Sequence, residues 1–411
     1  MNPAKQRSSV MSAGGVIPLW QLFLSYIIIG SIGFGPTLAA ETRKRLVQQK
    51  QWIKEEEFAV GLALTQLLPG ATFVNLTVYI GYRLRGFAGA LTAFFALLLM
   101  PFAAMLTLSH IFFFYQSVEV VGILFKGIAV VIVGVIAHAV LEIGRFTVHD
   151  VEAGFIALAA AGLIIFLKNP FVVLLAAATG GILAYYCSFQ CQTDLLTESN
   201  HVDKSKAGNS GIQVWPPVIL AAIIAVVLFI APIQPVLLKL WWVFLRMGAV
   251  LFGGGLSMIP FIQQEVVSNY GWLTLDEFAV GIALSQITPG PVLIIATFIG
   301  YKVAAVSGAI AATLGIFFSS LFLVISTAEI HQRIRNNLWV QAALKGIAAS
   351  FIGMMTVMVI GLAQHALIDL FSFYVAAAVF VALRFGRLGT ISVILTGTLA
   401  YFVFVSLGLA G

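Results

Sequence analysis

Charged side chains are scarce in this sequence. They make up 9% of its 411 residues, whereas apolar residues make up 61%, and a soluble domain carries about 25% charged residues. This scarcity excludes an ordinary soluble domain. Roughly a dozen apolar stretches approach the length that a helix needs to cross a bilayer, about 20 residues. The alternating segments of a transmembrane β-barrel are missing. The sequence therefore predicts an all-α polytopic membrane protein.

Cysteine and membrane-embedded acids are scarce as well. The two cysteines, Cys187 and Cys191, are too few for a zinc site, so we expect no metal and no cofactor. The apolar segments hold no Ser/His/Asp set, HExxH motif or aspartate pair, so we expect no enzyme. The near absence of acids there also disfavours a cation as substrate. We assign the pI of about 9.3 to basic loops that set membrane topology, not to nucleic-acid binding.

The chain contains two copies of one unit. Residues 57–70 match residues 277–290 at ten of fourteen positions, and LFKGIA at 124–129 matches ALKGIA at 343–348. One extra crossing between the copies turns the second copy upside down, so we predict an inverted repeat. The expected parts are a first transporter repeat (1–187), a polar linker (188–214), an extra transmembrane segment (215–235) and a second, inverted repeat (236–411).

A Pro-Gly pair interrupts an apolar segment in each half, at Pro69-Gly70 and at Pro289-Gly290. Proline lacks an N–H and pushes the residue before it out of the α conformation, and glycine lets the chain turn. About eleven residues lie on either side of the break, and they span ~16 Å, half of the hydrocarbon thickness. Two structures remain open: a re-entrant hairpin with its tip near the midplane, and a kinked helix that crosses the membrane.

Loop cations favour the re-entrant alternative. If the first two segments of each half enter and leave on one side, sixteen Lys and Arg residues collect there, and only Lys168 and Lys302 lie opposite. The positive-inside rule makes the crowded side cytoplasmic. This topology has nine crossings in a bacterial-type plasma membrane, with the N-terminus cytoplasmic. We expect no cleavable signal peptide, because the short polar N-terminus leads straight into the first apolar segment.

The breaks are where backbone groups become available to a ligand. A broken helix presents free N–H groups at the start of its second arm, and these bind anions. Two amide side chains lie beside the breaks, and three cations lie within apolar segments, where snorkelling to the interface is their alternative role. The candidate substrate-binding residues are Gly35, Pro36, Gln66, Pro69, Gly70, Lys126, Arg246, Gly253, Gly254, Gly255, Gln286, Pro289, Gly290 and Lys345.

These residues resemble the chromate ion transporter family in its two-domain, long-chain form. The motifs that this family carries in each half are an FGG-type stretch, W-x(5)-F, Q-x-x-PGP and a Gly-Tyr, and the resemblance covers nearly the whole chain. Their counterparts here are FGP (34–36) and FGGG (252–255), Trp52 to Phe58 and Trp272 to Phe278, QLLPGA (66–71) and QITPGP (286–291), and Gly81-Tyr82 and Gly300-Tyr301.

The resemblance implies a plasma-membrane transporter that exports chromate, confers chromate resistance and couples to the proton gradient. Sulfate or another oxyanion as substrate, and an anion channel as mechanism, remain alternatives, and a homodimer is one open assembly state. Half one departs from the family pattern at Tyr26, Ala71 and Asn75, and Arg45 aligns with Glu265. These departures leave the exact substrate open, because they alter charges and hydrogen-bond donors near the breaks.

Overall fold

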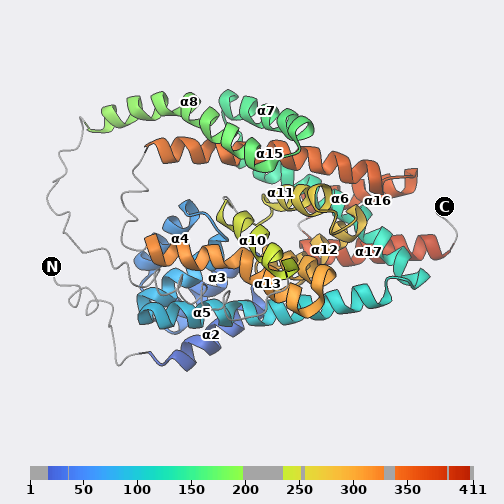
Figure 1. Ribbon diagram of the computed structural model, residues 1–411, viewed down its shortest axis with the longest axis horizontal. Coiled ribbons are helices and arrows are strands. Elements are labelled where there is room, and N and C mark those ends of the chain that lie inside the picture. Colours follow the sequence, from blue (N-terminus) through green and yellow to red (C-terminus); the bar gives the residue numbers. More distant parts are fainter. Residues whose placement is uncertain are drawn as a thin grey trace.

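The computed structural model describes residues 17–35, 37–197, 235–250, 255–327, 338–386 and 388–407, most of them helical (Figure 1). The first half contains α2 (Leu19–Ile32), α3 (Thr37–Thr42), η1 (Arg43–Gln49), α4 (Glu55–Leu67), α5 (Thr72–Tyr115), α6 (Glu119–Thr147), α7 (Val151–Leu167) and α8 (Pro170–Thr197). The second contains α10 (Pro235–Ala249), α11 (Ile259–Gln263), η2 (Gln264–Asn269), α12 (Leu275–Ile287), η3 (Val292–Ile294), α13 (Ile295–Thr327), α15 (Leu338–Ala366), α16 (Leu370–Phe385) and α17 (Thr390–Ser406).

The predicted all-α membrane class is confirmed. Four described helices are long and apolar enough to cross a bilayer, and α7, α16 and α17 are shorter apolar helices. Helix α8 extends to Thr197 and so includes residues 188–197 of the predicted linker, which no Gly or Pro interrupts. The rest of the linker and the extra segment up to residue 234 lie outside the described residues.

The segment around Pro69-Gly70 is a re-entrant hairpin. α4 begins at Glu55, in an acidic stretch that suits a helix N-terminus. After the break, the short arm of α5 (72–84) returns beside α4, and Arg83 Nη2 lies 3.1 Å from Glu57 Oε1. A helix that continued across the membrane would place these two side chains on opposite faces. The re-entrant prediction is confirmed and the kinked-helix alternative is wrong.

The second half repeats this hairpin. α12 starts with a capping box, in which the Thr274 hydroxyl accepts from the Glu277 N–H and the Glu277 carboxylate accepts from the Thr274 N–H. Lys302, at the end of the short arm of α13, lies 2.6 Å from Glu277 Oε1. Each half therefore closes its hairpin with one ion pair at the membrane face where the hairpin enters.

The short arm of α5 then turns back into a long arm (87–115). The turn lies at Arg85 and Gly86, whose φ values are −140° and 62°. A Cβ added at Gly81 would overlap the Gly89 carbonyl oxygen, so the two arms touch backbone to backbone. α13 turns the same way at Ala304 and Ala305. The long arms of α5 and α13 cross the membrane and pack against each other.

The first segment is re-entrant as well. α2 ends at Gly33, and the chain returns through α3 and η1. Arg85 donates a hydrogen bond to the Ile17 carbonyl just before α2. Arg43 Nε, at the start of η1, lies 2.6 Å from Glu55 Oε1 at the start of α4. Entry and exit of this segment therefore share the face where α4 begins, which we call face A.

The second half is inverted relative to the first. Its hairpin opens on the opposite face, face B, where His110 near the end of α5 lies 2.8 Å from the Tyr301 hydroxyl. His365, at the end of α15, lies 3.2 Å from Asp276 at the start of α12. We call α2 to α5 and α10 to α13 the inner bundle. In Figure 1, α4 lies toward the left and α12 further to the right within it.

The outer bundle comprises α6 to α8 and α15 to α17. In it, one helix of each half packs against helices of the other half. α15 packs against α7 and α8 of the first half, and α6 packs against α16 and α17 of the second. Glycines allow the close approach: a Cβ at Gly346 would overlap the Ala177 carbonyl oxygen, and one at Gly134 would crowd the Ala376 carbonyl oxygen. Neither half can therefore complete its outer bundle alone.

We predict that Gly300→Ala destabilises the protein. The new methyl group would overlap the Gly308 carbonyl oxygen, and such overpacking costs about 1–3 kcal/mol. Gly162→Ala, inside α7 with open space around its Cβ position, is the matched control and should be neutral or stabilising because alanine favours helix. Thermal unfolding in detergent measures both variants. Equal melting temperatures for the two would contradict the hairpin contact.

Candidate functional site

The helix breaks of the two halves meet. The Gly290 N–H donates to the Gly33 carbonyl at 2.7 Å, and the Gly35 N–H donates to the Gly290 carbonyl at 3.0 Å. Gly35 has a φ of 46° and Gly290 a φ of 109°, in the left-handed region that glycine adopts without strain. The Cβ positions of Gly35 and Gly255 both lie against Val292. Three of the predicted glycines thus converge, from both halves of the chain.

Each hairpin tip packs on the long arm of the other half. We call Pro69, Gly70 and Ala71 tip one, and Pro289, Gly290 and Pro291 tip two. The Ala71 N–H donates to Ser320 Oγ on α13 at 3.0 Å, and the Cβ position of Gly290 overlaps the Pro101 ring on α5. Pro101 and Ser320 are equivalent in the repeat, 219 residues apart. The tips therefore lie where the two long arms pass each other.

Asn75 explains one departure of the first half from the family pattern. It is fully buried, and its Nδ2 donates to the carbonyls of Leu68 and Pro69 at 3.5 and 3.2 Å. The proline break frees these carbonyls, and water cannot satisfy them in hydrocarbon. The second half has Ile294 at the equivalent position. Asn75 thus caps the broken helix of tip one.

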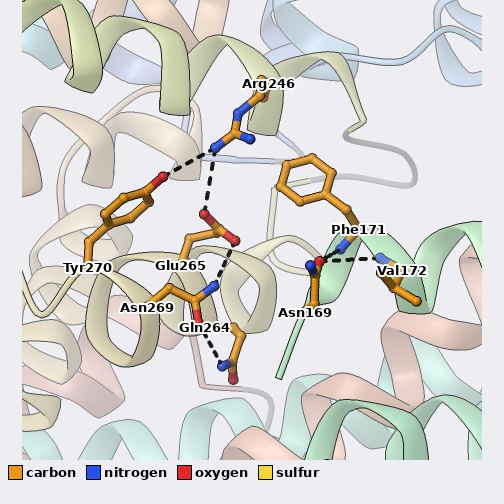
Figure 2. Close-up of polar contacts among 8 residues, drawn as sticks. All are labelled: Asn169, Phe171, Val172, Arg246, Gln264, Glu265, Asn269 and Tyr270. Carbon is orange, nitrogen blue, oxygen red and sulfur yellow. Dashed lines mark hydrogen bonds and ion pairs between the residues drawn. The ribbon is translucent and has the colours of Figure 1, made fainter. Parts of the chain in front are cut away.

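Arg246 lies in a polar cluster on face B of the inner bundle (Figure 2). Its Nη2 lies 3.4 Å from the Tyr270 hydroxyl and 4.0 Å from Glu265 Oε2. Its guanidinium carbon lies 5.1 Å from the centre of the Phe171 ring. The side chain is 37% exposed, but its buried Nε finds no hydrogen-bond partner among the described residues. Arg246 therefore keeps a donor that none of the described residues uses.

The partners of Arg246 come from two segments, α8 with Phe171 and η2 with Glu265 and the adjoining Tyr270. Glu265 is 6% exposed and accepts a hydrogen bond from Asn269 Nδ2 at 3.0 Å. Tyr270 stacks on Trp272 and lies under the Lys239 ammonium. In the sequence, Glu265 stands out only because its repeat equivalent is Arg45. Sequence reasoning missed Asn269, Tyr270 and Phe171, for which the pattern gives no signal.

Helix α10 connects Arg246 to tip one. Two residues after Arg246, the Cβ position of Gly248 lies 2.5 Å from Ser319 Oγ on α13. The next residue, Ser320, is the one that binds tip one through Ala71. The helix that carries Arg246 and hairpin tip one therefore contact neighbouring residues of α13.

The repeated lysines lie elsewhere. Lys126 is exposed on α6. Lys345 Nζ lies 3.0 Å from Asp150 Oδ2 and 4.1 Å from the centre of the Tyr185 ring, at the contact of α15 with the first half. Both positions belong to the outer bundle. The structure thus separates the two lysines from the hairpin tips.

The remaining candidates differ in exposure. Gln66 is exposed, Gln286 is half-buried, and Pro69 and Pro289 are half-buried at their tips. The predicted Pro36, Gly253 and Gly254 lie outside the described residues. Among the residues that the structure describes, no group of three or more His, Cys, Asp or Glu side chains could hold a metal.

An all-α membrane protein with two inverted repeats, whose broken helices meet between the halves, has an architecture found among membrane transporters. The profile of the family described as Chromate transporter matches residues 20–182 and 238–402. The chain belongs to this chromate transporter family.

Individual relatives agree with the family. A chromate transport protein of Pseudomonas aeruginosa is 30% identical, covering 84% of this chain and 81% of the relative. One of Cupriavidus metallidurans is 28% identical over 86% and 84%. An uncharacterized transporter of Methanocaldococcus jannaschii is 30% identical over 88% of each chain. No solved structure matches the chain.

The Asp150–Lys345 pair supplies a pH-dependent prediction. Burial raises the pKa of Asp150, but hydrogen bonds from Tyr185 and Lys345 outweigh this, so the pKa lies below its ordinary value. The stabilisation is present above the ordinary carboxyl pKa and is lost as pH falls through the lowered one. Both side chains are partly exposed, so its size is about 1 kcal/mol or less.

Asp150→Asn should therefore lower the melting temperature at neutral pH, and the difference from the parent should shrink in acid. Glu152→Gln, which removes an exposed carboxylate two residues away, is the control and should change little. A deficit of Asp150→Asn that stays constant down to acidic pH would contradict the ion pair.

Proposed function

We propose that the protein exports chromate across the plasma membrane and thereby confers chromate resistance. Family membership and the relatives named chromate transport proteins support this substrate. Sulfate is the second candidate, because it is also a tetrahedral dianion and a site built from charge and hydrogen-bond donors accepts both. The single observation that carries the proposal is the Arg246 guanidinium, whose buried Nε has no partner among the described residues, on a helix that packs against the stretch of α13 that holds tip one.

The proposed site suits an oxyanion chemically. A guanidinium offers planar, paired N–H donors that match the oxygens of a tetrahedral anion. We include Arg246, the break residues Gly35, Pro36, Gly70, Gly253 to Gly255 and Gly290, and the amides Gln66 and Gln286. We leave out Lys126 and Lys345, because they lie on the outer bundle.

The two hairpins differ in a way that supports alternating access. α12 packs against α6, α15 and α17 of the outer bundle, whereas the main neighbours of α4 are α5 and η1. Val280 on α12 is fully buried, and its repeat equivalent on α4, Val60, is 51% exposed. The same holds for buried Ala283 and exposed Ala63. Near-identical sequences thus occupy two different environments.

We infer that α4 and α12 alternate between these two environments during transport. In the described state α12 is packed on the outer bundle and α4 is released. In the alternate state α4 packs there and α12 is released, which opens face B instead of face A. Cations such as Arg43, Arg83 and Arg85 gather on face A, and the positive-inside rule makes that face cytoplasmic.

Thiol labelling tests this exchange. In a background with Cys187 and Cys191 replaced by serine, Val60→Cys should react about tenfold faster or more than Val280→Cys without substrate, because a minor state is populated at roughly 10% or less. Chromate turnover should raise the Val280→Cys rate. Equal rates at rest, or a Val280→Cys rate that turnover leaves unchanged, would contradict the exchange.

Transport itself is measured as chromate accumulation in inside-out membrane vesicles, with and without an uncoupler and with excess sulfate. We expect saturable accumulation that the uncoupler abolishes, whereas a channel would give linear, gradient-driven flux. Arg246→Ala and Gln286→Ala should abolish it at unchanged protein levels. Arg384→Ala, which removes an outer-bundle cation lying against the Phe385 ring, is the control. Normal transport by Arg246→Ala would refute the site.

A further inference from the structure

Glu265 is a buried acid placed against the proposed substrate-binding cation. Its side chain is 6% exposed, and its Oε2 faces Arg246 Nη2 at 4.0 Å. Asn269 holds the other carboxylate oxygen at 3.0 Å (Figure 2). A buried ion pair needs close geometry to offset the desolvation of both charges, and 4.0 Å is longer than a charge-assisted hydrogen bond. The Glu265 carboxylate therefore lies near the Arg246 guanidinium but forms no close hydrogen-bonded ion pair with it.

Charge balance links this carboxylate to anion binding. With Glu265 ionised, the Arg246 charge is already neutralised. A dianion that arrives at the guanidinium then meets a fixed negative charge at short range, in a partly desolvated place where such repulsion is strong. One proton on Glu265 removes the repulsion and frees Arg246 for the dianion.

The first half cannot perform this step. Tyr26 stands at the position of Arg246 and Arg45 at the position of Glu265. Tyr26 is fully buried, and its hydroxyl has no hydrogen-bond partner among the described residues. The pairing of an acid with a cation at these two positions thus occurs once in the chain, which sets the proton count at one.

We propose that Glu265 takes up one proton when a dianion binds to Arg246, so that proton and dianion cross together. This inference rests on the proposed function. The balance is simple: the carboxylate and a proton give the carboxylic acid, and no other bond forms or breaks. Net transfer is one negative charge, so an interior-negative membrane potential drives the complex outward. Besides Arg246 itself, the titratable groups around Glu265 are the Tyr270 hydroxyl and Lys239, which lies above the Tyr270 ring; the Lys168 backbone carbonyl accepts a hydrogen bond from the neighbouring Gln264.

Equilibrium binding to the purified full-length protein tests the coupling. Chromate affinity is measured over a pH series for the parent, for Glu265→Gln and for Glu265→Asp, with sulfate as a second probe in the same series. Chromate takes up a proton of its own at low pH, but this affects all variants equally. The difference between parent and Glu265→Gln therefore isolates the protein's proton.

We expect parent affinity to fall about tenfold further per pH unit than that of Glu265→Gln once Glu265 is ionised, as linkage of one proton requires. Glu265→Gln should bind more tightly than the parent at high pH, and Glu265→Asp should keep the parent's pH dependence. Calorimetry in two buffers of different ionisation enthalpy should count one proton taken up by the parent and one fewer by Glu265→Gln.

Parallel pH profiles for parent and Glu265→Gln, with binding intact, would overturn the coupling and leave the proposed function standing. A Glu265→Gln protein that melts like the parent but binds neither anion would also overturn it, because Glu265 would then serve only to position Arg246. A folded parent that binds neither chromate nor sulfate would overturn the proposed function and this inference together.

Discussion

The structure depends on one constraint: backbone that leaves the helical conformation inside a membrane must be satisfied by protein. Each half breaks two helices at membrane depth, and the other half supplies much of what the breaks need. Gly290 bonds to Gly33 and Gly35, and Ala71 bonds to Ser320. Asn75 is the local exception, since it caps its own hairpin. The breaks can therefore exist only where the halves meet.

The same constraint bears on the proposed function. A site between the halves changes its exposure whenever one half moves relative to the other, and the exchanged outer helices keep the halves joined while they move. The hairpins are closed by ion pairs at opposite faces, Glu57–Arg83 and Glu277–Lys302. Each hairpin can thus move as a unit without unpairing a charge. The different burial of Val60 and Val280 fits a molecule at rest in one of two related states.

Much of this fold could be predicted from the sequence. The Pro-Gly pairs, the repeat offset and the distribution of loop cations together predicted re-entrant hairpins in inverted halves. The exchange of α6 and α15 could not be predicted, because hydropathy shows that a face is buried but not which helix covers it. For the same reason the sequence could not show that Lys345 pairs with Asp150. In the sequence, Glu265 differs from its repeat equivalent, Arg45, but nothing there indicates its role. That role depends on its contact with Arg246, and the spacing of the two residues along the chain does not predict this contact.

The most direct test of the central claim is to locate the anion itself. Chromium scatters anomalously near its absorption edge, so diffraction from crystals soaked in chromate would mark the bound anion. The account predicts one chromium peak between the Arg246 guanidinium and the meeting helix breaks, lost in Arg246→Ala. A peak on the outer bundle beside Lys126 or Lys345, with none near Arg246, would contradict it.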